Sequence, residues 1–124
     1  MVLFLIDDWA DAGDKVMHSS TNILTSLFVR GRHLGCACWI LTQKLRVISL
    51  VCRTNICWML VWKMRHAMEL RSLMEELSVL LPKDTLMEMY NMATREKHGF
   101  WYINLLNEEP HMFYKCVDHR MLVN

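Results

Sequence analysis

Val2-Leu-Phe-Leu-Ile-Asp7-Asp8 is the stretch that decides the fold, because a run of apolar residues ends there in two adjacent acids. A continuous apolar run is typical of a strand that is buried on both faces, such as a central strand of a parallel sheet. The carboxyl ends of such strands form the edge at which α/β proteins bind ligands. The stretch therefore predicts two carboxylates at a ligand-binding edge. The alternative interpretation is a pair of solvated acids that begin a loop.

Outward from this stretch, apolar runs alternate with helical patterns. The predicted strands cover residues 2–6, 36–41, 56–62, 100–106 and 111–116, and the predicted helices cover residues 21–30, 70–77 and 84–93. The last two strands form a hairpin around a turn that contains Pro110. Asp84 is expected to cap the third helix and Gly99 to end it. Strands that alternate with helices indicate an α/β fold with a largely parallel sheet.

Composition limits the classes of protein to which the chain can belong. Its 124 residues are enough for one small domain, and 53% hydrophobic with 22% charged residues is a globular balance. A net charge of +1 excludes a strongly basic tail but not a local basic patch. No apolar run approaches the roughly 18 residues that are needed to span a bilayer. The five cysteines form no C-x-x-C pair, so we expect reduced, mostly buried thiols of an intracellular protein.

Two further patterns could contribute to chemistry. Gln43 follows the strand predicted over residues 36–41, and a glutamine at such a strand end can orient water and sense a γ-phosphate. Arg30 and Arg32 flank Gly31 after the first predicted helix, and paired guanidinium groups suit a phosphate or a subunit interface. The alternative for both arginines is a favourable interaction with the carboxyl end of the helix dipole.

Other residues are weaker candidates for a site. The spacing of Cys36, Cys38, Cys52 and Cys57 does not match a zinc knuckle, and no H-E-x-x-H sequence occurs. The tryptophans at positions 39, 58, 62 and 101 lie in runs typical of strands, so we interpret them as core residues and not as platforms for base stacking.

Taken in order, these motifs resemble those of the FtsK/HerA-type DNA-packaging ATPases of large DNA viruses, the poxvirus and giant-virus group. The resemblance rests on the acidic pair at 7–8, the sequence Arg30-Gly-Arg-His33, the strand ending in Thr42-Gln43, and Arg53-Thr-Asn55. It extends with good specificity over residues 2–55 and more loosely over the remaining helices and strands. It implies a RecA-like P-loop NTPase core.

The resemblance also implies roles for individual residues. Asp7 would bind Mg²⁺ and Asp8 would activate water, as in a Walker B motif. Gln43 would be the sensor of the nucleotide. Arg30 or Arg32 would reach the nucleotide of a neighbouring subunit, and both would lie on the same sheet edge as Asp7 and Gln43 or close to it. Arg53 would belong to that edge as well. The implied cofactors are Mg²⁺ and ATP, and the implied partners are the other subunits of a homo-oligomeric ring and double-stranded DNA, with no membrane.

One motif of the family is missing. The phosphate-binding sequence G-x-x-x-x-G-K-[ST] does not occur in the chain. We therefore expect a partial RecA-like core, the part of a P-loop ATPase domain from the Walker B strand onward, that does not hydrolyse ATP or bind nucleotide well alone. The parent protein would act in the host cytoplasm, the virus factory or the virion.

Two rival interpretations remain. The chain could be a non-catalytic decoy that associates with full-length packaging ATPase subunits. It could also be an unrelated α/β domain.

Overall fold

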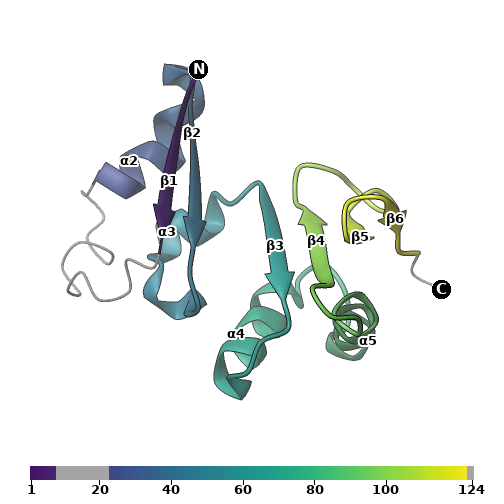
Figure 1. The fold of residues 1–124 in the computed structure, drawn as a ribbon. Helices are drawn as coiled ribbons and strands as arrows, with labels where there is room; N and C mark the ends of the chain where they lie inside the picture. Colours follow the sequence, from purple (N-terminus) through teal and green to yellow (C-terminus); the bar gives the residue numbers. More distant parts are fainter. Residues whose placement is uncertain (8–22, 123–124) are drawn as a thin grey trace. The chain divides into compact units, whose positions relative to one another are not determined.

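The computed structural model describes residues 1–7 and 23–122, apart from the side chain of Arg32. The chain divides into two compact units, Met1–Ile56 and Cys57–Asn124. Figure 1 shows the helices and strands of each unit. No helix in the described ranges has both the length and the apolar character that crossing a membrane requires.

The first unit is a pair of parallel strands with short helices. Its elements are, in chain order, β1 (Val2–Asp7), α2 (Ile23–Arg30), the 3₁₀ helix η2 (Gly31–Leu34), β2 (Cys36–Leu41), the 3₁₀ helix η3 (Leu45–Val47) and α3 (Leu50–Thr54). The register runs from Val2 opposite Cys36 to Asp7 opposite Leu41. The first strand is therefore where the apolar run predicts it, and its neighbour is the next predicted strand. The prediction that this strand is buried on both faces is wrong, since every residue of β1 except Ile6 is exposed.

The core of the first unit lies on one face of this strand pair. Three residues are buried together: Leu24 of α2, Ile48 at the end of η3, and Cys52 of α3. The side chains that pack against them include Ile6, Phe28, Cys38, Ile40 and Val47. Because side chains alternate along a strand, Leu3, Leu5, Trp39 and Leu41 belong to the opposite face, where they are 54%, 62%, 40% and 45% exposed.

The second unit is an antiparallel sheet with two helices. Its elements are β3 (Trp58–Trp62), α4 (Ala67–Leu77), α5 (Lys83–Ala93), β4 (Phe100–Asn104), β5 (Phe113–Lys115) and β6 (His119–Arg120). The strand order is β3-β4-β5-β6. Helix α5 packs on β4 and β5, and α4 packs on α5. The buried residues between helices and sheet include Leu73, Leu86, Trp101, Ile103 and Phe113.

The structure confirms the predicted order of elements but not a largely parallel sheet. The predicted helices over 70–77 and 84–93 correspond to α4 and α5, and the predicted hairpin corresponds to β4 and β5. Within the described residues, however, only β1 and β2 pair in parallel, while β3 pairs antiparallel with β4. A short, fully apolar run such as Trp58–Trp62 has no periodicity that distinguishes the two pairings. The architecture is mixed α/β, and the RecA-like assignment remains a prediction.

Local details also differ from the expectations. Residue 82, a proline, occupies the N-cap position of α5, and Asp84 lies in the first turn instead of capping it. Helix α5 ends at Ala93 with Thr94 as its C-cap, so Gly99 belongs to the turn before β4 and does not end the helix. The sequence patterns did not indicate α3, whose N-cap is Ser49: the hydroxyl of this residue accepts a hydrogen bond from the Cys52 backbone N–H at 3.3 Å.

Candidate functional site at the carboxyl ends of the parallel strands

Asp7 lies at the carboxyl end of the parallel strand pair. It is the last residue of β1, it is exposed, and its register partner is Leu41, the last residue of β2. Because the strands are parallel, both carboxyl ends lie at the same end of the sheet. The structure thus brings together Asp7 and the segment that contains Gln43, as the sequence predicts. Asp8 lies outside the described residues.

A tight turn positions Gln43 after β2. The Thr42 hydroxyl accepts a hydrogen bond from the Lys44 backbone N–H at 3.1 Å and lies 3.2 Å from the Lys44 carbonyl oxygen, to which it donates. A side chain that bonds the backbone two residues onward is a common way to stabilise a turn. Gln43, at the centre of this turn, is exposed. The threonine of the Thr-Gln sequence therefore has a structural role, and the amide of Gln43 faces solvent.

The arginine pair lies at the opposite end of the strands. Arg30 ends α2, and η2, which contains Arg32, leads through Gly35 directly into the first residue of β2. The backbone N–H of Val2, at the start of β1, donates to the Gly35 carbonyl at 3.0 Å. Six residues of β2 span about 17 Å at about 3.3 Å per residue. The expectation that Arg30 and Arg32 share an edge with Asp7 is therefore wrong.

Gly31 explains part of the Arg-Gly-Arg sequence in structural terms. It is buried, and a Cβ atom added to it would lie 3.1 Å from the carbonyl oxygen of Cys36 in β2. A larger residue would require a shift of a few tenths of an ångström against β2, so the small residue between the two arginines has a packing reason. Arg30 itself is exposed.

Arg53 and Asn55 belong to the end of α3. Arg53 is half-buried within the helix, which packs against α2. The Asn55 side chain donates to the Val51 carbonyl at 2.8 Å and its backbone N–H donates to the Cys52 carbonyl at 3.0 Å. The asparagine of the Arg-x-Asn sequence therefore closes the helix, and Arg53 is held by a helix and not by a strand end.

The residues present fit one half of an ATP–Mg²⁺ site. Mg²⁺ is commonly held by one or two carboxylates, with substrate phosphates and water as the other ligands, and the exposed Asp7 carboxylate fits that pattern. Among residues 1–7 and 23–122, no group of three or more His, Cys, Asp or Glu side chains could hold a metal ion without such help. The Gly-rich sequence that would hold the phosphates is absent from the chain. Asp7 would thus be one ligand of the metal, and these residues do not supply the phosphate cradle.

The cysteines are less buried than expected. Only Cys52 is buried, whereas Cys57 is exposed and the other three are intermediate. The expectation of mostly buried thiols is therefore wrong. Cys36 and Cys38 share the face of β2 that carries Ile40, but the short helices cover them only in part. Burial, with a smaller contribution from neighbouring Cys52, raises the pKa of the Cys38 thiol. Cys38 therefore favours its neutral, unreactive form.

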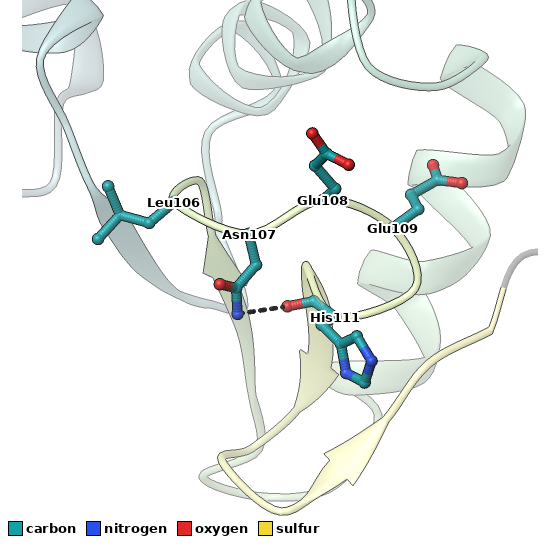
Figure 2. A pocket seen from close by; sticks show the side chains of 5 residues that line it. All are labelled: Leu106, Asn107, Glu108, Glu109 and His111. Carbon is teal, nitrogen blue, oxygen red and sulfur yellow. Dashed lines mark hydrogen bonds between the residues drawn. The ribbon is translucent and has the colours of Figure 1, made fainter.

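The second unit has a shallow hollow in the loop between β4 and β5. Leu106, Asn107, Glu108, Glu109 and His111 line it. The Asn107 amide donates to the His111 carbonyl at 3.2 Å, which closes the loop. Figure 2 shows the two glutamate carboxylates pointing away from the imidazole ring. These groups do not converge on a common point, so the hollow is not a candidate for metal binding.

Comparison with known proteins gives one family. The family described as Poxvirus A32 protein has a sequence model that matches residues 1–118 of the chain. A search of curated proteins gave no match. A search of solved structures also gave none.

Proposed function

Because the chain belongs to the poxvirus A32 family of viral DNA-packaging ATPases, we propose that it is the metal-binding part of an ATP-driven translocase of double-stranded DNA, without ATPase activity of its own. The observation that carries this proposal is the common position of Asp7 and Gln43 at the carboxyl ends of two adjacent parallel strands. Asp7 would contact Mg²⁺, Asp8 would accept a proton from the attacking water, and Gln43 would orient that water.

The lack of independent activity follows from the missing phosphate-binding sequence. In P-loop enzymes, backbone N–H groups and a lysine hold the β- and γ-phosphates. One carboxylate binds Mg²⁺ weakly when no phosphate shares its coordination shell. These 124 residues would therefore depend on a phosphate cradle that they do not themselves contain.

The position of the arginines supports a role toward a neighbouring subunit and not toward Asp7 of the same chain. Arg30 is at the amino end of the sheet, about 17 Å from the carboxyl end along β2. An arginine side chain does not bridge that distance. In a head-to-tail ring, however, two different surfaces of one subunit meet across each interface, and an arginine can then approach the nucleotide of the next subunit.

The second candidate function is that of a non-catalytic partner of full-length subunits. The open face of the β1–β2 pair favours it, because Leu3, Leu5 and Trp39 are 54%, 62% and 40% exposed there. An apolar sheet face of this kind is usually covered by another element. Insertion into a ring of full-length subunits would both cover this face and place Arg30 near a neighbouring nucleotide.

Two measurements test the proposal. The purified chain is expected to release no phosphate from ATP–Mg²⁺ above a buffer blank. Turnover that disappears in an Asp8→Asn variant would refute it, because the chain would then contain a complete site. The second measurement adds the chain to a full-length ATPase of the same family.

The mixing experiment separates the two candidates. A non-catalytic partner lowers the ATPase activity of the full-length enzyme in a dose-dependent way. The combined Arg30→Ala and Arg32→Ala variant should inhibit less, whereas Arg95→Ala, an exposed arginine after α5, is the matched control and should inhibit as the unmodified chain does. No inhibition by the unmodified chain would exclude the partner function. Equal inhibition by all variants would exclude the role of the arginine pair.

A further inference from the structure

The antiparallel sheet of the second unit has one face directed away from the buried core. The register pairs Leu60 with Tyr102, Trp62 with Phe100, and Tyr102 with Tyr114. Side chains alternate between faces, so these residues share the face opposite to Val61, Trp101 and Ile103, which are buried toward the helices. We call the set Trp58, Leu60, Trp62, Phe100, Tyr102 and Tyr114 the aromatic face.

The rings of the aromatic face are accessible and lie close to one another. Trp58 is 36% and Trp62 is 52% exposed, while Phe100, Tyr102 and Tyr114 are half-buried. The ring centroids of Trp62 and Phe100 are 5.3 Å apart, and those of Tyr102 and Tyr114 are 5.6 Å apart. The interpretation of four tryptophans as core residues is thus correct for Trp101, which is fully buried, and wrong for Trp58 and Trp62. It is also wrong for Trp39 in the first unit, which is 40% exposed.

One strand residue on the aromatic face carries a charge, and that charge is positive. Arg120 of β6 pairs with Tyr114 and so lies on the same face, where it is exposed. Lys63 and Arg65, one and three residues beyond the end of β3, are exposed cations in the segment that follows Trp62. None of the residues that share this face by register is acidic. Lys115 belongs to the other face and pairs with Glu96 at 2.6 Å, so it does not contribute to this charge.

We propose that the aromatic face binds single-stranded nucleic acid. Aromatic rings on an antiparallel sheet stack with unpaired bases, and nearby cations bind the phosphates. Successive residues on one face of a strand are about 7 Å apart, which is twice the roughly 3.4 Å between stacked bases of a duplex. This spacing fits bases that are splayed apart, as in a single strand. The proposal is independent of the ATPase assignment, which concerns the other unit.

A second copy of the chain fits this face less well. Stable protein interfaces contain about 20–30 residues on each side, far more than the set defined above. In a two-fold contact the same patch meets itself, so the positive charge of Arg120 would be present on both sides of the interface. A polyanion, in contrast, is attracted by the positive charge of Arg120.

The test is fluorescence anisotropy of a fluorescein-labelled 12-nucleotide oligothymidine with the full chain at low salt. Saturable binding is expected, and Trp62→Ala should weaken it about tenfold or more, since stacking on one ring contributes this much. Trp62→Leu, which keeps an apolar side chain in the sheet, should weaken it similarly. Trp39→Ala is the matched control, because Trp39 is 40% exposed in the other unit, and it should bind as the unmodified chain does.

Three outcomes would overturn the proposal. One is the absence of saturable binding by the folded chain. The second is equal binding of a 12-base-pair duplex together with no effect of Trp62→Leu, which would mean that only charge is recognised. The third is a dimer in sedimentation that Trp62→Leu dissociates, which would assign the face to a second copy of the chain.

Discussion

Replacing Gly99 by alanine should destabilise the second unit, because the turn before β4 has no room for a side chain. A Cβ atom at Gly99 would lie 2.6 Å from the carbonyl oxygen of Ala93 and 3.1 Å from that of Glu96. Both are backbone atoms, and Ala93 is fully buried at the end of α5. Relief of the overlap therefore requires movement of the helix end relative to the strand that begins at Phe100.

The size of the effect follows from two opposing contributions. Overpacking of a buried site costs about 1–3 kcal/mol. A glycine-to-alanine change also restricts the unfolded chain, which contributes about 0.4–1 kcal/mol in the other direction. Because the contact at Gly99 is closer than any real Cβ contact, the first contribution should dominate, with a net loss of about 1–2 kcal/mol. For a domain of this size the loss corresponds to a Tm lower by about 4–16 °C.

Thermal melts followed by tryptophan fluorescence measure this loss, since Trp101 is fully buried in the second unit and stacks on Phe113. The control is Gly35→Ala in the first unit. Gly35 has φ +64°, and a Cβ atom added to it would have no atom within 4 Å, so only backbone strain of about 1 kcal/mol applies, and Gly35→Asn should cost less. If Gly99→Ala melts at or above the temperature of the unmodified chain, the reasoning from the close contact is refuted.

Three further predictions concern single side chains. Ser49→Ala removes the cap of α3 and should destabilise the first unit by about 0.5–2 kcal/mol in urea denaturation, whereas Ser72→Ala, at an exposed turn of α4, should change little. Burial raises the pKa of the Cys38 thiol above the ordinary value of 9.0. The neutral thiol therefore contributes fully to the stability of the folded chain below pH 9.0, and this contribution is lost as the pH rises above that value. Cys38→Ala should flatten this pH dependence in melts between pH 7 and pH 10. The Trp101 ring N–H is buried without a hydrogen-bond partner among the described residues. Trp101→Phe should therefore reduce the free energy of unfolding by less than the about 3–5 kcal/mol expected for Trp101→Ala. Equal losses of stability for the two variants in urea denaturation would contradict this.

The sequence predicted those elements whose pattern is local. Apolar stripes with helical spacing located α4 and α5, and the polar turn between two apolar runs located the hairpin of β4 and β5. Helix α3 was missed because it has only five residues, too few for a repeating stripe, and its signal was the single capping residue Ser49. The pairing direction of β3 depends on residues about 40 positions away in β4, and no local pattern records such a partner.

The candidate site could be predicted only as far as it follows from the strand assignments. Two polar strand ends in neighbouring parallel strands must lie at one edge, so the closeness of Asp7 and the Gln43 turn required only the strand assignment. The aromatic face was not predictable, because alternate residues of Trp58–Trp62 are all apolar. Only the structure shows that the helices cover the face of Val61 and leave that of Trp62 exposed.

The prediction that the arginine pair shares an edge with Asp7 was wrong for a reason that the predicted topology already contains. A helix that joins two parallel strands begins near the carboxyl end of the first and must return to the amino end of the second. Residues at the carboxyl end of α2, such as Arg30, therefore lie at the amino edge of the sheet. It follows that an arginine in this position does not reach the Asp7 of its own chain, and the proposed contact with a nucleotide would be made to another subunit. The effect of Arg30→Ala should thus appear only in mixed assemblies, and a change in any property of the isolated chain beyond the few tenths of a kcal/mol expected from the helix dipole would contradict a role between subunits.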